Sequence, residues 1–341
     1  MRQEVTAGAS RVARALFVMM LIAVVAMSTR ASTMPPKGEP ERPDRSGLRY
    51  AVRMVDGSAQ ERPDAPNVTT HVLSGAGGED IHISISPDYE GELGAWTDYI
   101  GSLLHGSELS SVSFFILRPS EVAEWCGPRA FACYWPGIPP TIVAPGEDVS
   151  GGLTAEALLA HEYGHHLAYS RLNPPWGALD YGTKRWATYV DVCAAVLASE
   201  FFPGDEGENY ALNPAEGFAE AYRVTNQRRL GVDETLWRLV DDRFYPDSTA
   251  MRLIEQDVVD PWTAHNTVTY RGRFTRTRPS QHTFEVTTEL DGIATASVRA
   301  SEGTKVRVMK SMATVCGQRT TYFTVRRVKG FGRFELSVAR P

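Results

Sequence analysis

The chain has 341 residues, of which 43% are hydrophobic and 22% are charged, and its formal net charge at pH 7 is -6. This is the composition of an ordinary globular protein, and the length suggests about two domains. The negative charge gives no sign of a nucleic-acid-binding protein. Because no run of 18 apolar residues occurs, we expect no integral membrane span in the mature chain.

The N-terminus has the pattern of a secretory signal. Arginines precede an apolar run over residues 15–27, and small residues follow it up to Ala31. We therefore expect residues 1–31 to be a signal peptide and the mature protein to be secreted or held at the cell surface. An uncleaved signal-anchor is the alternative.

The following segments predict a mixed α and β region. Residues 32–69 are rich in Pro, Arg, Asp and Ser, which predicts a disordered linker or a short pro-segment. Beyond them, apolar patterns predict the strands of a small mixed sheet over 81–86, 112–117, 132–135 and 141–143. Helical spacing predicts helices over 91–104, 154–172, 184–201, 214–230, 234–240 and 248–258.

The pattern changes to β-strands near Asp260. Six strand-like runs separated by turn residues cover 268–274, 283–287, 295–299, 305–309, 322–326 and 333–338. The sequence therefore predicts an α+β chain, with a mixed domain over 70–259 and an all-β sandwich-like domain over 262–341.

The C-terminal segment 262–341 is basic although the whole chain is acidic. It holds 14 Lys and Arg residues against 5 Asp and Glu residues. Such a domain is suited to docking on an anionic cell-surface polymer, which is a candidate partner. The alternative is a soluble β-domain whose surface strands are merely basic.

The four cysteines predict disulfide bonds. An even number in an exported chain favours pairing, and four cysteines allow three arrangements. Cys126 and Cys133 flank Gly127-Pro128, a turn signal that favours a local bond between them. Cys193 and Cys316 then pair by elimination. None of the four has the spacing of a metal ligand.

The helix predicted over 154–172 carries the motif His161-Glu162-Tyr163-Gly164-His165. His161 and His165 are four residues apart, so both imidazoles lie on one helix face and can reach one zinc ion. Glu162 lies beside them and can contact a water held by that metal. A di-iron site is disfavoured, because the second ExxH, Glu79–His82, falls on a predicted strand.

A catalytic zinc site needs a third protein ligand. Ala168 and Arg171 stand where the metzincin continuation would require Gly and His. On the helix predicted over 214–230, Glu216 and Glu220 are four residues apart on one face. Glu216 suits the third ligand, and Glu220 suits a partner for the outer nitrogen of a ligating His.

With HEYGHH followed by EGFAE, residues 70–258 resemble the gluzincin branch of zinc metallopeptidases. The resemblance implies a zincin-like domain over 70–259, with a small mixed sheet, an active-site helix and a helical C-terminal subdomain. It implies His161, His165 and Glu216 as ligands of one Zn²⁺ per chain, Glu162 as the catalytic base and Glu220 behind the ligands. It also implies that an edge strand, here 132–135, holds an extended protein or peptide substrate.

The sequence leaves several site assignments open. Glu220 could itself be the ligand, and Asp180 and Asp191 are rivals through an incomplete aspzincin pattern at Gly182-Thr183. The donor to the oxyanion is a hypothesis by proximity alone. Tyr222 and Tyr210 are the first candidates, beside Arg223 and Tyr169.

The function we expect is a secreted zinc-dependent peptidase in which Glu162 acts on metal-activated water. One alternative is a catalytically inactive zincin-like binding protein of the cell surface. Another is a zinc amidase that acts on cell-wall peptides. A purely structural zinc site takes a fourth protein ligand and needs no general base. The presence of Glu162 therefore favours the enzyme.

Overall fold

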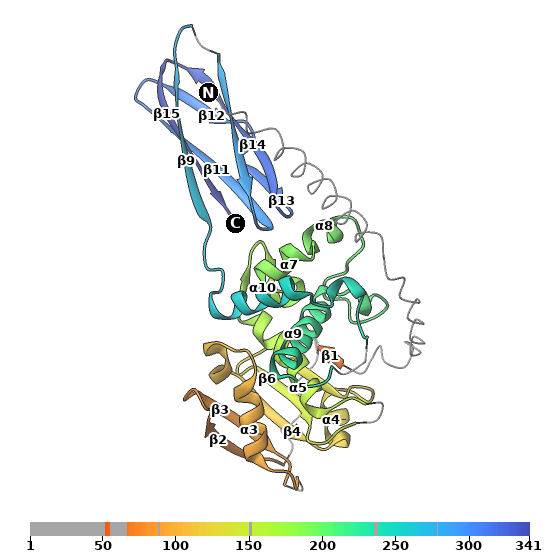
Figure 1. Ribbon diagram of the computed structural model, residues 1–341. Helices are drawn as coiled ribbons and strands as arrows, with labels where there is room; N and C mark the ends of the chain where they lie inside the picture. The colour runs from red at the N-terminus through yellow and green to blue at the C-terminus, as the bar shows by residue number, and fades with distance from the viewer. Residues whose placement is uncertain (1–51, 55–66, 88, 150–151, 235–237, 278) are drawn as a thin grey trace, which may run out of the picture. The chain divides into compact units, whose positions relative to one another are not determined.

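The computed structural model describes residues 52–54, 67–87, 89–149, 152–234, 238–277 and 279–341 (Figure 1). Helices and strands occur in similar proportion, which confirms the α+β class. The predicted signal peptide, residues 1–31, lies outside the described residues. So does most of 32–69, although Val52–Met54 within it forms strand β1.

A six-stranded mixed sheet occupies the N-terminal half, in the order β1-β5-β6-β4-β3-β2. The strands after β1 are β2 (Thr69–Ser74), β3 (Asp80–Ile85), β4 (Ser113–Leu117), β5 (Ala132–Trp135) and β6 (Thr141–Pro145). β3, β4 and β6 run parallel, while β2 is antiparallel to β3 and β5 is antiparallel to β6. The apolar run in β4 is buried because helices cover both faces of the sheet.

β5 is not an edge strand, contrary to the expectation for an extended-substrate strand. β1 pairs with it in parallel along its outer side, with Val52 opposite Ala132 and Met54 opposite Tyr134. β6 lies on its other side. Both hydrogen-bonding edges of β5 therefore have a neighbouring strand within the protein.

Helices lie on both faces of this sheet. Helix α3 (Leu93–Ser102) and helix α5 (Ala155–Tyr169) share a large apolar core with one face, which includes Ile83, Phe114 and Leu159. Helix α4 (Pro119–Cys126) packs on the opposite face in a second core. The Cys126–Cys133 disulfide, predicted from the turn between the two residues, joins α4 to β5 and is confirmed.

A group of helices follows α5. They are α6 (Ala178–Tyr181), α7 (Lys184–Tyr189), α8 (Val192–Leu197), α9 (Pro214–Leu230) and α10 (Ser248–Val259), with short 3-10 turns at Tyr210–Leu212 and Asp242–Phe244. Another 3-10 turn, Ser107–Ser111, lies between α3 and β4. A two-residue strand pair, β7 (Leu172–Asn173) and β8 (Trp176–Gly177), links α5 to α6. α9 and α10 match the predicted helices closely.

Two helix predictions in this group are wrong. The single helix expected over 184–201 is two helices, because Asp191 adopts a left-handed conformation (φ 57°) that ends α7 and begins α8. Asp tolerates this backbone region better than most residues. The helix expected over 234–240 is also absent from the described part of that range, Glu234 and 238–240.

The C-terminal strands form two antiparallel sheets, of order β10-β14-β12 and β13-β11-β15-β9. They are β9 (Asn266–Phe274), β10 (Gln281–Thr288), β11 (Gly292–Ala300), β12 (Lys305–Val308), β13 (Met312–Val315), β14 (Arg319–Lys329) and β15 (Gly332–Arg340). Phe323, Phe334 and Leu336 belong to one apolar core that both sheets share. The sequence predicted six of these strands and missed β13.

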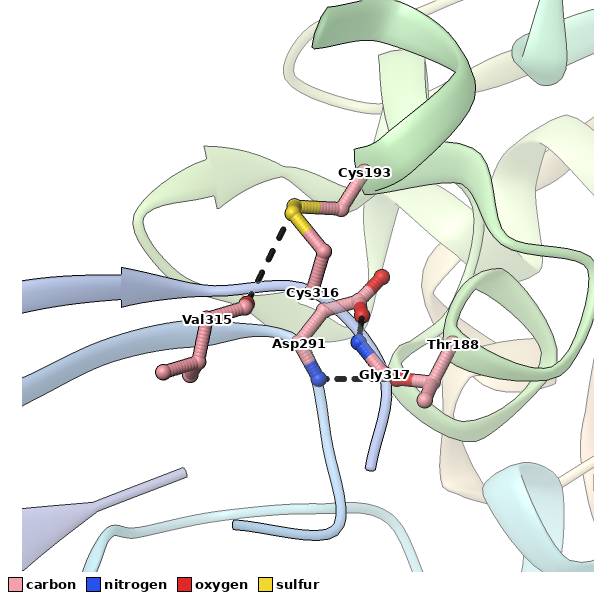
Figure 2. Close-up of a disulfide and its surroundings, with 6 residues drawn as sticks. All are labelled: Thr188, Cys193, Asp291, Val315, Cys316 and Gly317. Atoms are coloured by element: carbon pink, nitrogen blue, oxygen red, sulfur yellow. Dashed lines mark hydrogen bonds between the residues drawn. A yellow bond between two sulfur atoms is a disulfide. The ribbon is translucent and has the colours of Figure 1, made fainter. Parts of the chain in front are cut away.

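The second disulfide joins the helices to these strands. Cys193 of α8 is bonded to Cys316, which follows β13, as expected by elimination (Figure 2). Beside this bond the amide of Asp291 donates to the Thr188 hydroxyl at 3.0 Å, and the amide of Gly317 donates to the Asp291 carboxylate at 2.5 Å. The two regions are thus held by a covalent bond and by polar contacts.

Candidate metal centre

The first element of the site is helix α5, which carries the HExxH motif. Thr154 caps its N-terminus, because the side-chain oxygen accepts from the amide of Ala157 at 3.2 Å. Small and apolar residues flank the motif, so the helix is buried from Ala155 to Ala168 except at Glu156. The motif is therefore held inside the protein between the sheet and α9.

The second element is helix α9, whose ends follow the sequence closely. The Asn213 side chain accepts from the amide of Ala215, Pro214 occupies the first turn, and Gly231 ends the helix in the left-handed conformation. α9 crosses α5 where Gly164 meets Ala219. A Cβ atom at Gly164 would lie 2.7 Å from the Ala219 Cα, so only glycine permits this approach.

This close crossing brings the three expected ligands together. His161 Nε2 lies 3.1 Å from Glu216 Oε2, and His165 Nε2 lies 3.3 Å from Glu216 Oε1. One donor atom from each of the three residues lies within 4.8 Å of the other two. Two imidazole nitrogens and one carboxylate oxygen so arranged can hold a metal ion.

The hydrogen bonding of these side chains supports that assignment. His161, Glu162, His165 and Glu216 have no exposed surface. Within the part of the chain that the structure describes, neither carboxylate oxygen of Glu162 has a hydrogen-bond partner, nor do the ring nitrogens of His165. Buried polar atoms without partners are costly. A cation held by His161, His165 and Glu216 would bind one ring nitrogen of His165, and a water on that cation would give the Glu162 carboxylate a partner.

Glu220 lies behind the ligands. Its Oε2 is 3.5 Å from His161 Nδ1, the ring nitrogen on the far side from Glu216. The buried guanidinium of Arg223 donates to both oxygens of Glu220, at 2.6 and 2.7 Å. Arg223 thus occupies both Glu220 oxygens, and one of them also faces His161, which leaves Glu216 as the carboxylate that faces both histidines.

Burial and charge act on these groups in opposite directions. Burial lowers the pKa of His165, whereas at His161 the carboxylates of Glu216 and Glu220 outweigh burial and raise the pKa to about 9. At Glu220, Arg223 outweighs burial and lowers the pKa to about 2. Burial raises the pKa of Glu162 well above its ordinary value, and a cation at the site would oppose that effect.

The two tyrosines proposed as oxyanion donors occupy different places. The Tyr210 hydroxyl donates to Glu216 Oε2 at 2.6 Å, so it orients the expected ligand. The Tyr222 hydroxyl donates to the Leu104 carbonyl at 2.6 Å and is not directed at the three ligands. Tyr222 therefore links α9 to the segment that follows α3, while Tyr210 belongs to the site.

Further residues support the motif from the sheet side. The ring of Tyr134 in β5 stacks on His165, with ring centroids 6.4 Å apart. His166 points away from the three ligands, and its Nε2 lies 3.0 Å from the Glu108 carbonyl oxygen. His166 is thus a packing residue on another side of the helix from the three ligands.

Sequence reasoning missed two contacts of the site. The i,i+3 spacing of Glu220 and Arg223 was a usable signal for their ion pair, whereas the Tyr134–His165 contact joins residues 31 positions apart without a local pattern. Asp180 and Asp191, the aspzincin-type rivals, are not members of the group of His, Cys, Asp and Glu residues that can hold a metal within the described ranges.

No protein-family model, curated protein or solved structure matches this chain. Two disulfides indicate an oxidising, extracellular environment. Across the described residues, none of the helices has the length and apolar character needed to span a membrane.

Proposed function

We propose that this protein is a secreted zinc metallopeptidase of the gluzincin type. The observation that supports the proposal most strongly is the meeting of His161, His165 and Glu216 beside the unpartnered carboxylate of Glu162. Three protein ligands are the number that a catalytic zinc uses, because the fourth position serves water or substrate. A structural site would require a fourth protein ligand.

The donor set suits zinc among the common metals. Zn²⁺ accepts imidazole and carboxylate ligands in tetrahedral sites, and one charged ligand with two neutral ones is a usual catalytic combination. Zinc would supply Lewis acidity, which polarises a peptide carbonyl and acidifies water at neutral pH. The chain's own residues must then orient the ligands and move the proton.

Glu162 is the residue that would move the proton. It follows His161 directly on α5, is fully buried, and has both oxygens available within the described part of the chain. It would accept a proton from the attacking water and deliver it to the amine nitrogen that leaves. Tyr210 and Arg223 would keep Glu216 and, through Glu220, His161 in place during this transfer.

The fold supports the same proposal. A mixed sheet covered by α5, followed by α9 that supplies the downstream Glu, is the arrangement that the gluzincin resemblance implied for residues 70–259. The disulfides are consistent with export of the mature protein. Protein or peptide is the proposed substrate.

Hydrolysis of casein by the full-length protein and its Glu162→Gln variant tests the proposal. The amide keeps the size of the side chain but cannot act as a general base. We expect a loss of at least about 100-fold in kcat/KM, with the metal content unchanged. Glu156→Gln is the matched control, because Glu156 is on the same helix and exposed.

Metal content and casein hydrolysis together distinguish the proposed enzyme from its alternatives. Equal casein hydrolysis by wild type and Glu162→Gln would contradict the role of Glu162. Zinc bound without casein hydrolysis in wild type would favour the inactive binding protein or the amidase. Cleavage of cell-wall peptides by wild type and not by Glu162→Gln would then identify the amidase.

A further inference from the structure

Four arginines gather on the outer face of the four-stranded C-terminal sheet. Arg271 and Arg273 belong to β9, Arg299 to β11 and Arg333 to β15, and all four are exposed. The residues that alternate with them along the strands, such as Phe274 and Phe334, belong to the shared core. We refer to these four residues as the arginine face.

The strand register places these arginines in two adjacent rows. Arg299 is opposite Glu335, which is opposite Arg271, and this makes one row across three strands. In the next row Arg333 is directly opposite Arg273. Like charges in directly opposed positions destabilise a sheet, so folding alone does not favour this arrangement.

The charge of the arginine face is poorly neutralised within the protein. Arg271 forms an ion pair with Glu335 at 3.0 Å, and the Arg271 side chain is 82% exposed. Among the residues that the structure describes, Arg273, Arg299 and Arg333 have no ion pair or side-chain hydrogen bond. Three guanidinium groups are therefore available to an anionic ligand on one face of the sheet.

Hydroxyl groups continue the same surface. The row beside Arg299 and Arg271 contains Ser297, Ser337 and Thr269 in register across the three strands. These side chains can bond to the hydroxyls of a sugar, while each planar guanidinium binds a carboxylate or sulfate through two parallel hydrogen bonds.

We propose that the arginine face binds an extracellular anionic polysaccharide that carries carboxylate or sulfate groups. Several charges set by the strand register on one sheet face suit a repeating polymer better than a single small anion. Large apolar side chains that could enter a membrane are not exposed on these rows. The disulfides indicate an extracellular environment, where nucleic acid is the less suitable partner.

The opposite sheet provides a matched control. On β12 and β14, Arg307 is directly opposite Arg326, and both are exposed. This second pair has the same charge and is likewise directly opposed across two strands, but Val328, two residues from Arg326 on β14, is exposed beside it. Reversal of either arginine pair changes the net charge of the protein equally.

The test measures binding of the full-length protein to heparin, a polysaccharide with both sulfate and carboxylate groups, at about 0.15 M salt. We expect Arg273→Glu with Arg333→Glu to weaken binding at least about tenfold, and Arg307→Glu with Arg326→Glu to weaken it less than about threefold. Circular dichroism and thermal unfolding show whether each variant is folded. Casein hydrolysis serves as an independent measurement, because neither pair contacts the metal centre.

The single variant Arg333→Glu gives a second test that does not depend on the double variant folding. It places a carboxylate opposite Arg273, so it should raise the unfolding temperature and still weaken heparin binding. Equal effects of the two double variants would overturn the proposal in favour of a general charge effect. Absence of heparin binding by wild type, or equally tight binding to single-stranded DNA or anionic phospholipid vesicles, would overturn it as well.

Discussion

At the scale of single residues, the hydrogen bonds of two tyrosine hydroxyls distinguish residues that the sequence pattern could not distinguish. Tyr210 and Tyr222 are both buried tyrosines near Glu216 in the chain. Only the Tyr210 hydroxyl reaches Glu216, whereas the Tyr222 hydroxyl bonds to Leu104 in another element. Sequence proximity predicted both as candidates because it does not give the direction of a side chain.

Replacement of each tyrosine by phenylalanine tests this distinction. Tyr210→Phe removes the hydrogen bond to Glu216 and should lower metal affinity about 10-fold or more. Tyr222→Phe should leave metal affinity and kcat unchanged and cost about 1 kcal/mol of stability, because its hydroxyl donates to the Leu104 carbonyl and not to a candidate ligand. Metal titration and denaturant unfolding measure both effects. A loss of kcat that is larger in Tyr222→Phe than in Tyr210→Phe would instead support Tyr222 as the oxyanion donor.

The candidate ligands could be proposed from the sequence because each helix fixes its own spacing. His161 and His165, and likewise Glu216 and Glu220, lie on one face at four-residue separation. The choice between Glu216 and Glu220 depended on how α9 crosses α5, which is a tertiary property. Arg223 resolves that choice, since it binds both oxygens of Glu220.

At the scale of elements, the crossing of α5 and α9 determines whether the ligands meet. Gly164→Ala would place a methyl group against the backbone of Ala219 and push the helices apart. We expect it to lower stability by about 1–3 kcal/mol and to lower metal affinity. Gly94→Ala in α3 is the control, because a Cβ atom there meets nothing within 4 Å. Unchanged metal affinity in Gly164→Ala would show that the metal site tolerates a wider separation of α5 and α9.

Strand β1 gives a prediction about substrate access. An extended peptide can add to a sheet only along a free strand edge, and β1 lies along the outer edge of β5. If substrate pairs with β5, a chain that begins at residue 67 should cleave casein several-fold faster than one that begins at residue 45. Equal rates for the two chains would show that substrate does not use this edge.

The elements that were predicted well have strong local signals. α9 has Asn213 and Pro214 at its start and Gly231 at its end, and its observed limits agree with the prediction. The break at Asp191 has no Gly or Pro to mark it, and β1 pairs with a strand about 80 residues away. Such features depend on tertiary contacts, which a local pattern does not contain.

At the scale of the whole molecule, the junction at the Cys193–Cys316 disulfide contains a buried acid (Figure 2). Burial raises the pKa of Asp291 to about 6 from 3.8, although the Gly317 amide and Lys184 act against the shift. Asp191 nearby raises the pKa further. The folded protein therefore holds a proton on Asp291 between about pH 4 and 6, where the unfolded chain has lost it.

This difference predicts a pH dependence of stability. A pKa raised on folding contributes stability at low pH, and the contribution is lost as the pH rises through about 6. Between pH 4 and 7 the unfolding free energy should fall by roughly 2–3 kcal/mol more in wild type than in Asp291→Asn, which cannot ionise. Urea unfolding with the disulfides intact measures this. The same pH dependence in both proteins would contradict it.

The central claim is that His161, His165 and Glu216 hold one metal ion, with Glu220 behind them. The most direct test is the zinc content of the purified full-length protein and of two isosteric variants, Glu216→Gln and Glu220→Gln. We predict about one zinc per chain in wild type, loss of zinc in Glu216→Gln, and retained zinc with roughly 10- to 100-fold weaker affinity in Glu220→Gln. Absence of zinc from wild type, or loss of zinc in Glu220→Gln with retention in Glu216→Gln, would contradict the assignment.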